Sequence, residues 1–403
     1  MFSTKMYLLS QFESMDSAYW GMGSAANGII YFSLCAHLPQ KSATSFSFNS
    51  VNKKITKLFS LSDTIATENG LMTQGKIHTP IYQGIDGYLY FASHFSYPLG
   101  KYIPFIKYEG GHLFSLNPKT NEIFDLGIPM PNEGILSMVL DSKRMILYML
   151  TAPSAYFLVY DIQSKHTHNL GRVFEQGSIC RSLVVDDEGN VYGSLEPNKI
   201  FKFNKSKFIL EYLNVILPDS SRKISEWKGP SRKGVNNIGR KMWRSAIWDD
   251  GTKKIYGIHA GTSKLFIFDP ISEQIEEGKF MGINSFINQP EKNYPTLSLV
   301  QFNRTLFYSP AGGFFDYARS EKIKKYSHLV TYDLLKHKKV DHGEIIDSEG
   351  RKVFGIAGAT VDKRGMLYLV GAVETRKNER YNKHNLLQGK PFHLALIEID
   401  SLS

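Results

Sequence analysis

The chain has 403 residues, of which 42% are hydrophobic, 13% aromatic and 21% charged, and these proportions indicate a globular protein. No apolar run approaches the ~20 residues that a helix needs to cross a bilayer, so we expect no helical membrane span. The formal net charge of +10 favours an anionic partner such as a nucleic acid, an acidic polysaccharide or a membrane surface, without selecting one of them.

The cysteine content and the N-terminal segment narrow the class further. Cys35 and Cys180 are the two cysteines, and neither belongs to a CxxC pair, which argues against a Cys-based zinc site and a disulfide framework. We expect both to be buried thiols. Residues 1–20 contain one early lysine, a short apolar patch and then acids, which is a poor secretory signal. Localisation is therefore unknown, with the cytoplasm as the default.

One short pattern recurs along the chain: an alternating apolar segment that ends in Asp or Asn, then a turn and a second short strand. Successive copies lie 43 to 68 residues apart. The seven copies end at Asn49, Asn117, Asp161, Asn204, Asp269, Asp333 and Asp400. Repeats of this length predict a repetitive architecture rather than a chain of unrelated domains.

A second hairpin with a turn rich in Asp, Asn or Gly precedes each copy of the pattern. The clearest examples are 137–150, 181–195, 244–259, 298–310 and 358–372. Four strands per repeat, seven times, without a sustained helical stripe, predict an all-β, seven-bladed β-propeller. We expect one domain over 1–403 and a monomer. The segment Lys5–Gln11 reads as a spare strand that joins the last blade and closes the ring.

The segment Gly75–His94 is predicted to form one hairpin about the turn at 84–87. Antiparallel pairing about that turn places His78 opposite Ser93 or His94. Two histidines would then lie at the open end of one hairpin, on adjacent strands and within reach of a shared ligand.

The same reasoning applies to later repeats. Arg244 pairs with His259 about the turn at 250–252, and Arg181 faces Leu195 or Glu196 at the start of its repeat. These pairings gather five residues around one opening: His78, His94, Arg181, Arg244 and His259. Trp243, Tyr102 and Tyr108 are candidate aromatic walls for a bound ligand. Long inserts at 95–111, 218–241, 280–294 and 312–328 are predicted to be functional loops.

Such a set suits β-elimination on a uronic acid polymer. An arginine fork neutralises the carboxylate, a neutral imidazole takes the C5 proton, and a second histidine or a tyrosine protonates the leaving oxygen. Structural interpretations stand beside this one. A histidine at a hairpin end is often a hydrogen-bonding cap, and an arginine at a strand start often forms an ion pair. A metal site on His78, His94 and a third histidine is an alternative that the spacing does not select.

Several segments resemble the seven-bladed β-propeller polysaccharide lyases, the group that includes ulvan lyases and rhamnose–glucuronate lyases. The segments are 76–94, 110–127, 179–194, 242–270 and 328–343, and the resemblance spans nearly the whole chain. The family's active centre holds two histidines, an arginine and a tyrosine. The resemblance implies that these are His78, His94 and Arg181, with Tyr156 as a nearby substitute for the tyrosine. The segment 150–161 has Ala152 where relatives often carry an aromatic residue.

The expected function is therefore a lyase acting on an acidic, uronate-containing and optionally sulfated glycan, with Arg244, His259, Trp243, Tyr102 and Tyr108 in substrate binding. The reaction requires no cofactor, and a divalent ion, if bound, would be structural. The alternative is a non-catalytic propeller that binds an acidic glycan or a protein. A third interpretation, nucleic-acid binding through the eight Lys and Arg of 222–244, is weaker. We expect neither a nucleic acid nor a membrane as the partner.

Overall fold

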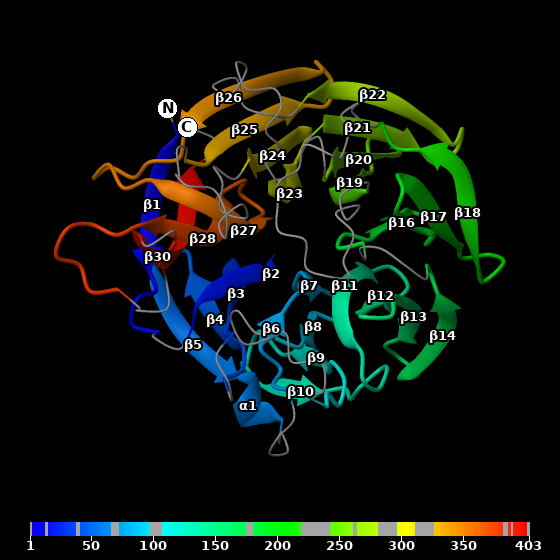
Figure 1. Ribbon diagram of the computed structural model, residues 1–403, viewed down its shortest axis with the longest axis horizontal. Coiled ribbons are helices and arrows are strands. Elements are labelled where there is room, and N and C mark those ends of the chain that lie inside the picture. The colour runs from blue at the N-terminus through cyan, green and yellow to red at the C-terminus, as the bar shows by residue number, and fades with distance from the viewer. Residues whose placement is uncertain are drawn as a thin grey trace. The chain divides into compact units, whose positions relative to one another are not determined.

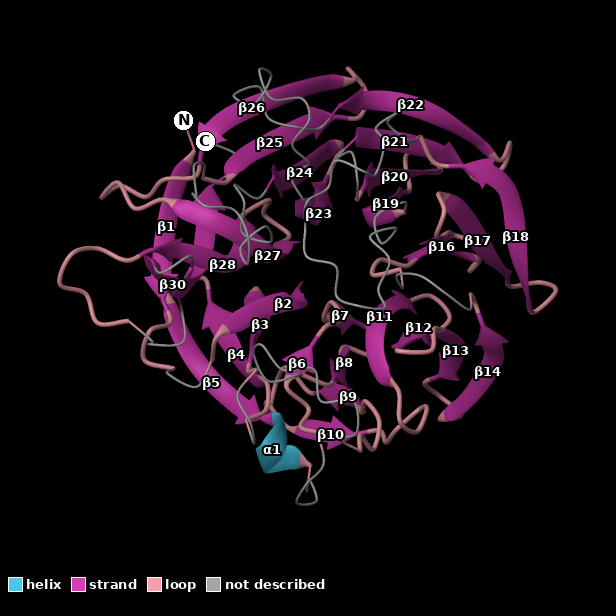
Figure 2. Ribbon diagram, in the orientation of Figure 1, coloured by secondary structure: helices cyan, strands magenta, loops and turns pink. Residues whose placement is uncertain are grey.

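The computed structural model describes most of the chain. The described residues are 2–12, 15–37, 41–65, 72–96, 107–174, 180–218, 242–260, 264–280, 296–310, 326–381, 386–387 and 390–400. They form strands in seven sheets of four or five strands each, with a single four-residue helix among them (Figures 1 and 2). The prediction of an all-β, seven-bladed β-propeller is confirmed.

Contacts divide the chain into two compact units. The first comprises 1–169, 346–351 and 357–403, and the second comprises 170–345 and 352–356. The expectation of one domain over the whole chain stays a prediction.

The first unit holds four blades, apart from residues 170–172 and 353–356 of their strands, which belong to the second unit. The blade after the N-terminal strand has the order β2-β3-β4-β5: β2 Ser17–Ser24, β3 Ile29–Cys35, β4 Thr44–Asn49 and β5 Lys54–Ser60, followed by α1 Leu61–Thr64. The next has the order β10-β9-β8-β6, with β7 also on β8: β6 Lys76–Ile77, β7 Tyr82–Gln83, β8 Leu89–His94, β9 Leu113–Leu116 and β10 Ile123–Asp125. The third is β11 Gly134–Asp141, β12 Ile146–Ala152, β13 Tyr156–Asp161 and β14 His166–Arg172.

The last blade contains strands from both ends of the chain, in the order β1-β30-β28-β27 with β29 on β30. Its strands are β1 Ser3–Leu8, β27 Val353–Val361, β28 Leu367–Glu374, β29 Leu386–Leu387 and β30 Lys390–Asp400. The pairing of β1 with β30 runs from Ser3 opposite Asp400 to Leu8 opposite Ala395. The predicted joining of the N-terminal strand to the last blade is confirmed, although the strand begins and ends a few residues earlier than expected.

The second unit holds three blades, each with its strands in sequence order. The first is β15 Val184–Val185, β16 Val191–Leu195, β17 Lys199–Asn204 and β18 Ile209–Ile216. The second is β19 Trp243–Asp249, β20 Lys254–His259, β21 Lys264–Asp269 and β22 Gln274–Phe280. The third is β23 Thr296–Phe302, β24 Thr305–Pro310, β25 His328–Asp333 and β26 Lys338–Glu344.

The recurring sequence pattern marks the third strand of every blade, because β4, β9, β13, β17, β21, β25 and β30 end at or beside its Asp or Asn. The side chain of that residue caps the turn: Asn49 Oδ1 accepts from the Val51 N–H at 2.9 Å, and Asp333 Oδ1 accepts from the Leu335 N–H at 2.9 Å. The fourth residue after it has a positive φ in six copies: Lys53, Asn121, Lys165, Phe208, Glu273 and His337. This is a type I turn closed by a left-handed residue, which matches the twist of the two strands.

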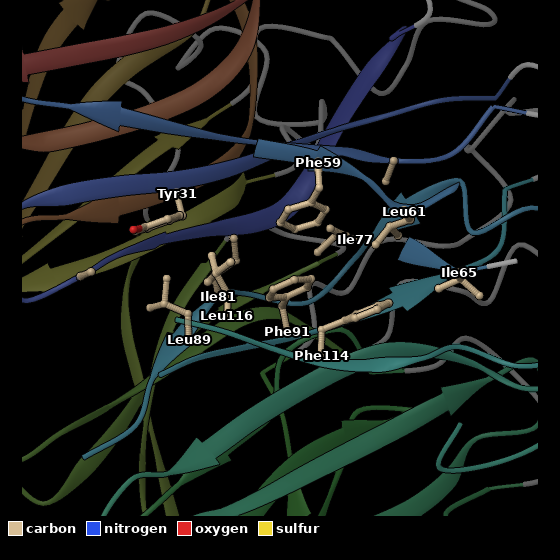
Figure 3. Close-up of a cluster of buried hydrophobic side chains, with 12 residues drawn as sticks. Tyr31, Phe59, Leu61, Ile65, Ile77, Ile81, Leu89, Phe91, Phe114 and Leu116 are labelled. Atoms are coloured by element: carbon tan, nitrogen blue, oxygen red, sulfur yellow. The ribbon is translucent and has the colours of Figure 1, made fainter. Parts of the chain in front are cut away.

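Stacked aromatic rings fill the core between the first two complete blades (Figure 3). The Phe91 ring is parallel to Phe59 at 6.0 Å and to Phe114 at 5.3 Å between centroids. All three side chains are buried, as the alternation of apolar residues along β5, β8 and β9 predicts. This core fixes β8, and β8 carries His94 at its end.

The described part of the chain contains no helix long and apolar enough to cross a membrane. Cys35 and Cys180 are both buried and free, as expected. Burial raises the pKa of the Cys35 thiol to about 12. Tyr102 and most of the four predicted inserts lie outside the described residues.

Candidate functional site

The β6–β8 hairpin brings two imidazoles together, with a register that differs from the expected one. Lys76 pairs with His94 and Ile77 with Ser93, so the predicted pairing of His78 with Ser93 or His94 is wrong. The reason is a change of register within the hairpin. Nearer the turn Tyr82 pairs with Tyr90, and this register is shifted by two residues from that of Lys76 and Ile77. In that interval the Ala92 N–H donates to a side-chain oxygen, Thr79 Oγ1, at 2.9 Å. The His78 and His94 ring centroids nevertheless lie 5.7 Å apart, at 70°.

His78 has a defined tautomer when neutral. Its Nδ1 lies 3.0 Å from the backbone oxygen of Leu136 on β11, and a carbonyl oxygen can only accept, so Nδ1 carries the proton. Nε2 is then the basic nitrogen. The side chain is buried, with 3% of its surface exposed.

His94 packs between an aromatic ring and a glycine. Its centroid lies 4.1 Å from that of Phe95, and 5% of its surface is exposed. A Cβ at Gly134, the first residue of β11, would lie 2.1 Å from His94 Nδ1. Only glycine therefore admits the imidazole in this position.

A tyrosine and a lysine stand beside this histidine pair. Tyr19 on β2 has its ring centroid 5.0 Å from that of His78. The Lys76 ammonium nitrogen lies 4.8 Å from the centre of the Tyr19 ring, a cation–π distance. Tyr19 and Lys76 are partly exposed, whereas both imidazoles are buried. We call His78, His94, Tyr19 and Lys76 the histidine cluster.

A carboxylate and a third histidine extend the histidine cluster. Asp16 accepts from the His37 backbone N–H at 2.7 Å and, at 2.8 Å, from His37 Nδ1. With Nδ1 protonated, Nε2 of neutral His37 accepts, and the Tyr19 hydroxyl lies 3.4 Å from it. Asp16, His37 and Tyr19 thus form a carboxylate–imidazole–phenol series that orients the phenol.

Sequence reasoning missed Asp16, Tyr19, His37 and Lys76. One signal was available for His37. The strands β3, β8 and β20 of three blades each have a histidine at or just after their end: CAH at 35–37, ASH at 92–94 and GIH at 257–259. Aligning the repeats on their second strand rather than on their third would have found it. Tyr19 has no comparable signal, since its contact with His78 depends on how two blades pack.

The predicted residues of the second unit differ from expectation in detail. Trp243, not Arg244, pairs with His259, and the register shifts between Trp243 and Ser245, so Arg244 lies in a β-bulge. The Trp243 indole is 1% exposed, donates to the Ser182 backbone oxygen at 2.8 Å and stacks on a phenylalanine. It fills the core of its blade and offers no face to a sugar, so its assignment as an aromatic wall is wrong.

His259 and Arg181 have structural surroundings of their own. His259 is 1% exposed, and its Nε2 lies 2.9 Å from Asn198 Oδ1. Arg181 is partly exposed and precedes the two-residue strand β15, so the ladder does not extend to the predicted partners Leu195 or Glu196. These residues belong to the second unit and the histidine cluster to the first. The common opening therefore stays a prediction.

Two predicted tyrosines lie in the first unit, outside the histidine cluster. Tyr108 packs against Met72 and Phe95, is 7% exposed and donates to Gln74 Oε1 at 2.6 Å. Burial raises the pKa of its hydroxyl well above the usual value. As a buried residue it supports Phe95 and forms no wall. Tyr156 begins β13 and packs partly buried against the core of its own blade.

His112, at the start of the segment that leads into β9, lies between two carboxylates. Its Nδ1 is 2.9 Å from Asp125 Oδ2, and its Nε2 is 3.4 Å from Glu109 Oε1. Burial lowers the pKa of His112, but the hydrogen bonds and charges of the two acids outweigh it, and the net pKa is raised. Among the residues that the structure describes, no group of three or more His, Cys, Asp or Glu side chains could hold a metal ion.

Comparison with known proteins supports the fold. No family model and no curated protein sequence matches the chain. A chain in the crystal structure of the mitotic checkpoint complex aligns at 8% identity and a TM-score of 0.56, over 97% of this chain and 92% of its own. A chain in the structure of YCF48 bound to D1 peptide aligns at 8% identity and 0.54, over 98% and 94%. Identity this low carries the fold and no function.

Proposed function

We propose that the protein is a polysaccharide lyase that cleaves a uronate-containing, optionally sulfated glycan by β-elimination, in the manner of the ulvan and rhamnose–glucuronate lyases. The observation that carries the proposal is the histidine cluster, in which two imidazoles, a phenol and an ammonium meet within one unit. The net charge of +10 suits an acidic polymer.

His78 is the proposed base. β-Elimination removes the proton on C5, next to the uronate carboxylate, and expels the oxygen on C4 to leave a C4–C5 double bond. The Leu136 carbonyl keeps the His78 proton on Nδ1, so Nε2 has a lone pair for the C5 proton. His94 packs at an angle to His78 and holds that ring in place.

Tyr19 is the proposed acid: its hydroxyl, which makes only a 3.4 Å contact with His37 Nε2, turns away when substrate binds and passes its proton to the leaving C4 oxygen. One proton then enters at His78 and one leaves from Tyr19, so the two must exchange a proton before the next turnover. This exchange passes through solvent, which reaches the partly exposed Tyr19. The Asp16–His37 pair orients the phenol through the contact between His37 Nε2 and the Tyr19 hydroxyl.

Lys76 is the cation of this unit that we assign to the uronate carboxylate. An ammonium next to the carboxylate stabilises the negative charge that develops when C5 loses its proton. An ammonium lacks the two-pronged geometry of an arginine, so a partner for the second carboxylate oxygen is still required. Arg181 and Arg244 stay predicted partners for that role.

The test is an ultraviolet absorbance assay for C4–C5 double bonds, with a panel of uronate polysaccharides and oligosaccharides as substrates. We expect the wild-type chain to raise the absorbance with at least one substrate, and His78→Ala to abolish the rise. His166→Ala is the matched control, because His166 is an exposed histidine on β14. A flat trace for the wild-type chain across the panel would refute the lyase.

A second candidate is a non-catalytic propeller that binds an acidic glycan. The burial of both imidazoles favours it, since His78 and His94 are only 3% and 5% exposed. A binding module has no turnover to lose, so retained glycan binding by a wild-type chain without turnover would support it. Loss of turnover in His78→Ala with retained binding would exclude it.

A further inference from the structure

A cavity of about 530 Å³ lies in the first unit, at the end of the blade β2–β5. The segment before β2 forms one wall, and the start of β4 and the end of β5 form another. Its lining residues are Gln11, Phe12, Met15, Lys41, Ser42, Thr44, Phe46, Lys57, Ser60 and Ser62. Cavities of about 300–1,000 Å³ are the usual size of small-molecule sites in proteins.

Two lysines line the cavity. The side chains of Lys41 and Lys57 are both exposed at the cavity, and the lining residues that the structure describes include no Asp or Glu. The Asp63 carboxylate, just beyond Ser62, accepts from the Ser60 N–H at 3.2 Å. These two ammonium groups favour an anionic group in the cavity.

The hydroxyl groups of the lining also favour an acceptor ligand. Ser42 Oγ donates to Ser62 Oγ at 3.0 Å, and Thr44 Oγ1 lies 2.9 Å from Ser60 Oγ. Each pair uses one hydroxyl hydrogen and leaves the other hydrogen available for a ligand. The cavity therefore offers two hydroxyl donors in addition to its two ammonium groups.

An aromatic ring completes the lining. Phe12 is partly exposed and packs against the buried Phe46, with ring centroids 4.5 Å apart. Apolar surface next to hydrogen-bond donors and cations suits a ligand that has a CH face, hydroxyl groups and negative charge. A sugar that carries a sulfate or a carboxylate has all three.

The cavity adjoins the proposed catalytic groups along the chain. Met15 lines the cavity, and the next residue, Asp16, holds His37. We infer that the cavity binds a sulfated or carboxylated sugar of the same polymer, at a position other than the bond that is cleaved. The identity of the ligand rests on the proposed function. Binding at such a remote position would hold the polymer in place during the reaction.

The test compares the binding of a sulfated uronate tetrasaccharide, its unsulfated form and inorganic sulfate by calorimetry. Lys41→Gln combined with Lys57→Gln is expected to weaken tetrasaccharide binding about tenfold at low ionic strength. Ser62→Ala removes an exposed hydroxyl without a charge change and is expected to weaken binding about threefold. The matched control is Lys54→Gln with Lys119→Gln, two exposed lysines of the same unit that do not line the cavity.

Three results would overturn the inference. These are no binding of either tetrasaccharide by the wild-type chain, equal affinity in the Lys41/Lys57 variant and the control variant, or inorganic sulfate binding as tightly as the saccharides. The two saccharides distinguish a sulfate from a carboxylate as the group that is recognised. Charge-dependent binding without any turnover would refute the lyase while leaving the ligand class of the cavity intact.

Discussion

Replacing Tyr19 by Phe separates the chemistry of the histidine cluster from its packing. The substitution keeps the ring that packs against His78 at 5.0 Å and lies 4.8 Å from the Lys76 ammonium, and it removes only the hydroxyl. The hydroxyl contact with His37 is 3.4 Å long, near the limit of a hydrogen bond, and the side chain is partly exposed. We therefore expect the free energy of unfolding to fall by less than about 1 kcal/mol.

The effect of Tyr19→Phe on turnover should be far larger. Loss of a general acid lowers kcat by about 10²–10⁴-fold, whereas KM should change little because the ring and the cation remain. The assay is the initial rate of double-bond formation across a substrate series, with thermal unfolding measured on the same samples. Tyr156→Phe is the matched control, since the two tyrosines compete for the same role. A kcat within threefold of wild type for Tyr19→Phe, or a larger loss for Tyr156→Phe, would refute the assignment.

Three further predictions concern packing and pH. Gly134→Ala places a methyl group 2.1 Å from His94 Nδ1, so we expect it to displace the imidazole and to shift the His94 ring signals in NMR spectra; unchanged signals would contradict the packing. The hydrogen bond from an arginine lowers the pKa of Glu379 from 4.5 to about 2, so this carboxylate stabilises the fold above pH 4.5 and loses that effect as the pH falls toward 2. Glu379→Gln should therefore lower the free energy of unfolding by about 2 kcal/mol at neutral pH, after allowance for solvent screening, and by much less at pH 2. Urea titrations at both pH values measure this, and an equal loss at the two pH values would be inconsistent with the prediction. Phe91→Ala empties the centre of the aromatic stack in Figure 3 and should lower the free energy of unfolding by about 3–5 kcal/mol. Ile85→Ala, at an exposed side chain, should change it hardly at all. Similar unfolding midpoints for the two variants would contradict the core assignment.

The fold could be predicted because its signals are local. The turn after the third strand forms from contacts within a few residues of sequence. An Asp or Asn side chain caps it, and the fourth residue after that side chain is left-handed. The extended alternation before each turn is equally local. Seven copies of one strand pattern, six of them followed by this turn, therefore sufficed to count the blades and to find the strand that β1 joins.

The candidate site was less predictable because its geometry is not local. A two-residue shift in the β6–β8 hairpin and a bulge at Arg244 changed the pairs that a regular ladder predicts. Burial of Trp243 depends on how strands stack, and a run of sequence does not reveal this. The contact between Tyr19 and His78 joins two blades.

The shared last blade has a consequence for the order in which the chain is made. β1 leaves the ribosome several hundred residues before its partner β30. Until β30 has been made, β1 has no native strand to pair with, so it is an open edge that a chaperone or another nascent chain could engage. Because Ser3 and Asp400 are direct partners, a short linker between them with new ends in a surface turn such as 51–53 would make both strands neighbours in the polypeptide. Such a circular permutant should refold faster than the parent chain, since pairing β1 with β30 would then close a loop of a few residues instead of several hundred.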